Sequence, residues 1–156
     1  MKTPENLFFE NKNYHLYHLP ELNILVIEAK GVIQLEPAKE AWLKALDKAI
    51  EFNIARWIAD GAQIQMIHPK ANEWIVSEFF VLTAQKLKLE EKRLTATILP
   101  PRFYAEMNAK EVVNKKIAHD ANAGENMIQR DNRYFQDFEA AYEWIVNYPG
   151  NDTEEG

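Results

Sequence analysis

The stretch DGAQIQMIHPK, residues 60–70, holds the side chains best placed to do chemistry or to bind a partner. It follows an apolar run that predicts a buried strand over residues 55–59, and it precedes a helical pattern. Asp60 would stand at the carboxyl end of that strand, where open α/β sheets bind ligands. His68 could transfer a proton near neutral pH. We therefore take this segment as a loop that binds a partner or ligand, with Asp60, Gly61, His68, Pro69 and Lys70 as its candidate residues.

The same residues also have structural interpretations. Asp60 can cap a loop by accepting bonds from nearby backbone N–H groups, and His68 can serve as a loop or cap residue before the helix. An enzymatic acid–base pair would require both side chains to converge within hydrogen-bond reach in a concave site. The sequence leaves these alternatives open, and our leading expectation is a protein without catalytic residues.

Several kinds of site are excluded by residue types and spacing. The chain has no cysteine, so thiolate metal sites, disulfides and cysteine nucleophiles are ruled out. His15 and His18 lie three residues apart in a predicted strand and therefore point to opposite faces, so they cannot bind one metal ion together. The five glycines form no phosphate-binding motif, and Ser77 lies in no nucleophile turn. We expect no metal and no cofactor.

Aromatic residues concentrate in the second predicted helix and the corner after the last apolar strand. They can fill the core, form a surface for self-association or line an apolar pocket. The candidate pocket residues are Trp74, Phe79, Phe80, Phe103 and Tyr104.

Composition limits the class of protein. The 156 residues, 47% of them hydrophobic, suit one domain over residues 1–148 with a disordered acidic tail at 149–156. The formal charge of -6 and the scattered basic residues argue against nucleic-acid binding. No run is long and apolar enough for a membrane span, and we expect a cytoplasmic protein.

The apolar patterns predict a mixed α/β sheet of four or five strands, opened by a β-hairpin at residues 14–19 and 24–30, with helices packed against it. The run of Ile24 to Ile27 is typical of a strand buried on both faces. Strand 14–19 is expected near a sheet edge, where it could pair in a homodimer. The helix beginning near Pro69 is apolar around much of its circumference and should pack on more than one side. The remaining predicted elements are helices at 35–53, 103–124 and 137–148, a strand at 93–99 and a weak edge strand or linker at 126–135.

These elements resemble the small bacterial SpoIIAA-like proteins, which are grouped with STAS and SEC14-type domains. The resemblance is carried by the hairpin, RWIAD ending at Asp60, LTATILP and RYFQDFEAAYEWI, and it covers about residues 12–148. It implies a STAS-like fold and, in the best understood members, an anti-sigma factor antagonist. Such antagonists are switched by phosphorylation of a serine or threonine at the start of the helix after the third strand.

This chain departs from the pattern at that place, because it reads MIHPKANEW there and its only serine is Ser77. The phosphorylation switch is therefore not carried over. The sequence favours a non-catalytic STAS-like module that binds a protein through residues 60–70. The alternative is a carrier or sensor of an apolar small molecule or lipid, which the aromatic residues and the SEC14-type relatives suggest.

Overall fold

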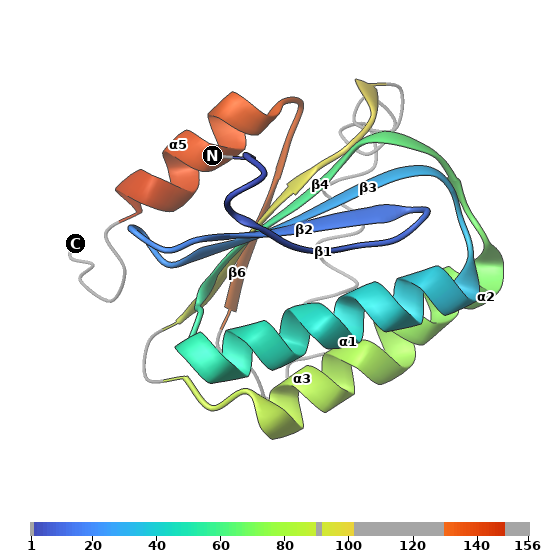
Figure 1. The fold of residues 1–156 in the computed structure, drawn as a ribbon, viewed down its shortest axis with the longest axis horizontal. Helices are drawn as coiled ribbons and strands as arrows, with labels where there is room; N and C mark the ends of the chain where they lie inside the picture. Colours follow the sequence, from blue (N-terminus) through green and yellow to red (C-terminus); the bar gives the residue numbers. More distant parts are fainter. Residues whose placement is uncertain (1, 90–91, 102–129, 149–156) are drawn as a thin grey trace.

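The computed structural model describes residues 2–89, 92–101 and 130–148, and these form three layers (Figure 1). A six-stranded sheet lies between two helical layers. The helix predicted at 103–124 and the tail at 149–156 lie outside the described residues. The strands are β1 (Leu7–Glu10), β2 (Tyr14–Leu19), β3 (Ile24–Ile33), β4 (Arg56–Ile67), β5 (Arg93–Ile98) and β6 (Arg130–Phe135). The helical segments are α1 (Leu35–Phe52), α2 (Pro69–Trp74), the π-helical turn η1 (Ile75–Phe79), α3 (Phe80–Lys86) and α5 (Phe138–Asn147).

The strands lie side by side in chain order. β1, β2 and β3 are antiparallel, whereas β3, β4, β5 and β6 are parallel. The sheet is therefore mixed, as predicted, but the expectation of four or five strands is wrong. The strand that the sequence analysis missed is β1, which has only four residues and little alternation.

The predicted hairpin is β2 and β3, but β2 is not the outer strand. β1 pairs with one side of β2 and β3 with the other. Both backbone edges of β2 are thus occupied, and strand 14–19 has no free edge for pairing with a second copy. The segment at 126–135 does form an edge strand, β6, over its second half.

Apolar residues from β3 contribute to both hydrophobic cores. Ile24 to Ile27 are at most 1% exposed, as expected for a strand covered on both faces. Leu25 and Ile27 pack in the core that α1 and the α2–α3 segment cover, whereas Ile24 and Val26 pack in the core beneath α5. The odd and even residues of one strand thus pack against different helical layers. Figure 1 shows these layers on opposite sides of the sheet.

The helix that begins at Pro69 contains a π-helical turn, in which the Phe80 N–H bonds to the Ile75 carbonyl. Ala71, Phe79 and Thr83 are its buried residues, at spacings that are multiples of four. A regular α-helix has about 3.6 residues per turn, so such a stripe would drift around the axis. The wider turn keeps the stripe on the sheet. The expectation of packing on several sides is wrong for Val76 and Val81, which are 55% and 53% exposed.

Asn13 connects the β1–β2 turn to the end of β3 and the start of α1. Its side chain is buried, and its Nδ2 donates to the carbonyls of Lys30 and Val32 at 3.1 Å. Its Oδ1 accepts from the Gln34 N–H at 3.2 Å. These bonds satisfy backbone groups at the end of β3 and at the start of α1.

Asn13→Asp should lower the free energy of unfolding by about 2–4 kcal/mol, because an oxygen would replace the Nδ2 donor and face two carbonyl oxygens. Urea unfolding measures the effect. Asn72→Asp, on the exposed side of α2, is the control and should change the value by less than about 0.5 kcal/mol. Equal midpoints for the two variants would contradict this role of Asn13.

Tyr14 is a buried ionisable group in the core between α1 and the sheet. It is 2% exposed, and its hydroxyl accepts a hydrogen bond from Trp42 Nε1 at 3.2 Å. Burial raises the pKa of Tyr14 to about 12, although the Trp42 bond by itself lowers the pKa. The folded state therefore favours the protonated phenol.

Stability should fall as pH rises from 10 through about 12, because the unfolded chain loses the Tyr14 proton first. The loss attributable to Tyr14 is about 2–3 kcal/mol. It is measured by urea unfolding across this range, with Tyr14→Phe as the comparison. The variant should lose less stability over the same interval, and an equally steep fall would argue against a raised pKa at Tyr14.

Candidate functional site

Strand β4 runs through most of the segment that the sequence predicts as a loop. It continues to Ile67 and pairs with β3 along this length, ending at the Ile33 and Ile67 pair. The loop assignment is therefore wrong for residues 60–67. Asp60 followed by Gly61 is a typical turn signal, but β3 extends equally far and supplies hydrogen-bond partners for the backbone.

Gly61 lies at an irregularity in the pairing of β4 with β3. Glu28 faces Asp60 and Lys30 faces Gln63, so β4 has one residue more than β3 in this interval. Such a bulge bends the strand and redirects its side chains. A Cβ at Gly61 would lie 3.0 Å from the Ile98 carbonyl oxygen on β5. Gly61 is thus needed for the close approach of two strands.

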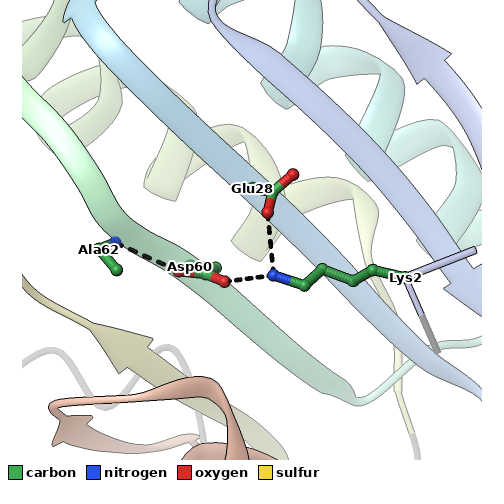
Figure 2. A network of polar contacts seen from close by, with 4 residues as sticks. All are labelled: Lys2, Glu28, Asp60 and Ala62. Atoms are coloured by element: carbon green, nitrogen blue, oxygen red, sulfur yellow. Dashed lines mark hydrogen bonds and ion pairs between the residues drawn. The ribbon is translucent and has the colours of Figure 1, made fainter.

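Asp60 and Glu28 are neighbours on the α5 side of the sheet, and Lys2 bridges them (Figure 2). Lys2 Nζ lies 2.8 Å from Asp60 Oδ2 and 2.9 Å from Glu28 Oε2. The other carboxylate oxygen of Asp60 accepts the Ala62 N–H at 3.2 Å. The Asp60 side chain is 8% exposed, so its charge is compensated inside the fold and is not directed to solvent.

The Lys2 ammonium is held in its charged form by these contacts. Burial alone lowers the pKa of Lys2, but the hydrogen bonds and charges of Asp60 and Glu28 outweigh burial and raise the pKa above its ordinary value. Lys2 Nζ also lies 4.6 Å from the centre of the Phe138 ring, at the start of α5. The cation is therefore in contact with two strands and a helix.

The polar residues continue across the sheet from this point. The strand registers place Glu10 beside His15, His15 beside Glu28, and Glu28 beside Asp60. His15 Nε2 lies 3.1 Å from Glu10 Oε1. Acidic side chains thus predominate in this line over four strands. Within the described ranges, no set of three or more histidine and carboxylate side chains is arranged to hold a metal ion.

His68 caps helix α2. Its ring Nδ1 accepts the backbone N–H of Lys70 at 3.1 Å, and the backbone N–H of His68 donates to the Ile33 carbonyl at 2.9 Å. Seven residues of bulged strand separate it from Asp60, and the eight steps along the chain would span roughly 25 Å if fully extended. The segment between them is strand as far as Ile67, so the two side chains do not converge as an acid–base pair. The candidate residues fall into two places, with Asp60 and Gly61 inside the fold.

The second place is the β3–β4 tip, by which we mean four exposed residues at the ends of β3 and β4 and the start of α2: Val32, Met66, Ile67 and Lys70. Val32 and Met66 are partners in the register, and the two residues are 40% and 51% exposed. Ile67 follows Met66 and is 37% exposed, but its side chain points to the opposite face of the sheet, the face of its register partner Ile33. Lys70 is exposed in the first turn of α2, as is Pro69.

Three of the five candidate pocket residues fill the core. Phe79 has no exposed surface, and its ring lies 5.0 Å from Trp42, 5.8 Å from Trp74 and 6.3 Å from Phe80, measured between ring centres. Trp74 and Phe80 are partly buried against the same core. The core interpretation of these aromatic side chains is thus the one that their packing supports. Phe103 and Tyr104 lie outside the described residues.

Sequence reasoning missed Lys2 and Glu28. Glu28 had a usable signal, because an acid inside an apolar strand requires a partner. Lys2 had none, because nothing in its surroundings indicates that it meets residues 28 and 60.

Comparison with known proteins identifies the fold. No protein-family model matches the chain. No curated protein matches it either. A crystal structure of an uncharacterized protein of the DUF3478 family from Shewanella loihica PV-4, described as having a SpoIIAA-like fold, does match. The two chains are 15% identical with a TM-score of 0.52, and the match covers 88% of this chain and 98% of the other. The chain therefore has a SpoIIAA-like α/β fold, as its sequence pattern predicts.

A membrane-spanning helix is not found among the described residues.

Gly61→Ala should lower the free energy of unfolding by about 1–3 kcal/mol, because the added methyl group would press against the Ile98 carbonyl and force β4 away from β5. Denaturant unfolding tests this. Gln63→Ala, at an exposed position in the same strand, serves as the control and should change little. If Gly61→Ala is as stable as the control, the close strand approach does not depend on glycine.

Proposed function

We propose that the protein is a non-catalytic binding module that docks a protein partner through the β3–β4 tip. The observation that carries this proposal is the exposure of the register partners Val32 and Met66 on one face of the sheet, at the adjoining ends of two strands, with Ile67 exposed on the other face of the same tip. Apolar side chains grouped on a surface are characteristic of interaction sites, and methionine adapts to varied partners.

The position of this surface in the fold supports the proposal. It lies at the carboxyl ends of parallel strands, the edge at which open α/β sheets bind. The ends of β3 and β4 are rigid, because they are paired with each other and His68 caps the helix that follows. A rigid apolar surface loses little conformational entropy when it binds. Lys70 and Pro69 would form part of the rim of the contact, and Lys70 would favour an acidic neighbour on the partner.

The same region gives no support for a phosphorylation switch of the antagonist type. Its helix cap is His68, which has no hydroxyl group. Ser77 lies within the helix, and its Oγ donates to the Glu73 carbonyl at 2.6 Å. We therefore propose a binding surface that is not regulated by a phosphate at the helix start.

A carrier of an apolar molecule has less support. Such a carrier would need aromatic side chains around an open cavity. Phe79 is instead enclosed by other rings. Organic extraction of the purified protein would favour the carrier only if it yielded one apolar compound per chain.

A photo-activated cross-linking residue placed at Met66 should capture one partner in the cells that make the protein, because this side chain is half exposed at the centre of the β3–β4 tip. Mass spectrometry of the cross-linked product identifies the partner. The same residue placed at Leu43, on the exposed side of α1, is the control and should not capture it.

Met66→Asp should then weaken binding of the captured partner at least about tenfold, as expected for a change at the centre of an interface. Lys70→Glu, at the rim, should weaken binding less, mainly by slowing association with an acidic partner. Equal capture from positions 66 and 43, or unchanged affinity in both variants, would exclude the β3–β4 tip as the docking surface.

A further inference from the structure

We infer that Glu28, Asp60 and the ring of Phe138 form a binding site for a primary ammonium group, and that Lys2 is an occupant supplied by the chain itself. The site lies on the α5 side of the sheet, apart from the β3–β4 tip, and it does not depend on the function proposed for that tip. Its external ligand would be a lysine side chain of another protein, which has the same ammonium group on the same four-carbon stem.

The carboxylates are brought together by the sheet itself. Glu28 and Asp60 are register partners on adjacent parallel strands, and their side chains are 18% and 8% exposed. Two carboxylates on directly paired residues repel each other, and burial strengthens the repulsion. A cation between the two carboxylates offsets this repulsion, so the pair favours a positively charged group whether or not that group is Lys2.

The receptor groups are fixed independently of Lys2. Asp60 is oriented by the Ala62 N–H at the bulge of β4. Phe138 is held at the first turn of α5, where Asp137 Oδ1 accepts the Ala140 N–H at 2.8 Å and caps the helix. The strands and the helix thus converge on one point and keep the receptor in place when the cation leaves.

The geometry matches an ammonium group. Lys2 Nζ donates to one oxygen of each carboxylate, at 2.8 and 2.9 Å (Figure 2). The Phe138 ring lies 4.6 Å away, within the range of a cation–π contact. An aromatic face attracts an alkylammonium ion but does not ligate a hard metal ion such as Mg²⁺, which requires oxygen ligands.

Lys2 belongs to residues 2–6, a segment that lies outside the helices and precedes the first strand of the sheet. Lys2 lies in no helix or strand. Residues 2–6 precede β1 and are held by local turn bonds such as Asn6 N–H to the Thr3 carbonyl, and by His18 N–H to the Asn6 carbonyl. Release of Lys2 would therefore vacate the site without breaking a strand or helix, and a second ammonium group could take its place.

The test uses the Lys2→Ala variant and n-butylammonium, which reproduces the lysine side chain. Lys2→Ala should lower the melting temperature by roughly 5 °C, because it leaves two partly buried carboxylates without a cation. Millimolar n-butylammonium should raise the melting temperature of Lys2→Ala most of the way back to that of the unsubstituted protein, and this increase should saturate with concentration. It should also shift the NMR signal of the Ala62 amide, whose N–H donates to Asp60.

Two controls separate specific binding from general charge effects. Tetramethylammonium has the same charge but no N–H donor, and it should not restore the melting temperature. Lys12→Ala removes an exposed lysine and should respond to neither salt. Equal effects of both salts on Lys2→Ala, or a melting temperature of Lys2→Ala equal to that of the unsubstituted protein, would overturn the inference.

If Lys2→Ala does not fold, the cysteine-free sequence provides a second route. Lys2→Cys introduces a single thiol, which is alkylated in the unfolded chain with either 2-bromoethylamine or iodoacetamide before refolding. The first reagent restores an ammonium group at nearly the length of lysine, and the second leaves a neutral amide. Refolding to native stability only with the ammonium form supports the site, and equal stability of both forms contradicts it.

Discussion

The pairing of β3 with β4 is the constraint on which the rest of the structure depends. These are the longest strands, and they remain paired from Ile24 and Arg56 to Ile33 and Ile67. β3 joins the antiparallel half of the sheet to the parallel half, and its alternating side chains supply both cores. β4 has more residues than β3 over the shared length, so the pair is bulged. The bulges determine where side chains at the carboxyl end point, because each extra residue changes the alternation of faces.

The same register has an electrostatic consequence. It places two acids side by side in a sheet face that α5 and the leading residues cover. The energetic cost of that arrangement explains why the Lys2 ammonium is drawn to this point and why it remains charged. A contact between positions 2, 28 and 60 therefore links the segment before β1 to the centre of the sheet and to the first turn of α5.

The β3–β4 tip and the Lys2 contact differ in physical character. At the β3–β4 tip the exposed groups are mostly apolar and stand on paired strand ends, a combination suited to a protein surface. At the Lys2 contact the groups are charged and largely buried, a combination suited to one cation in one geometry. His68 caps the helix that follows the first region, whereas Asp60 belongs to the second. The protein thus separates two residues, Asp60 and His68, that lie eight positions apart in the sequence.

The sequence by itself determined the fold class, the hairpin of β2 and β3, the helix starts at Pro69 and Phe138 and the burial of β3 on both faces. These features follow from local apolar periodicity and capping residues, which act over a few positions. For the candidate site, the sequence predicted residues but not their arrangement. His68, Pro69 and Lys70 do lie at the start of α2, but residues 60–67 are strand and not loop. Only tertiary structure decided the length of β4, the π-helical turn, β1 and the meeting of Lys2 with Glu28 and Asp60. Each of these depends on backbone pairing, packing or charge neutralisation between segments far apart in the chain, and such long-range contacts leave no local pattern from which they could be read.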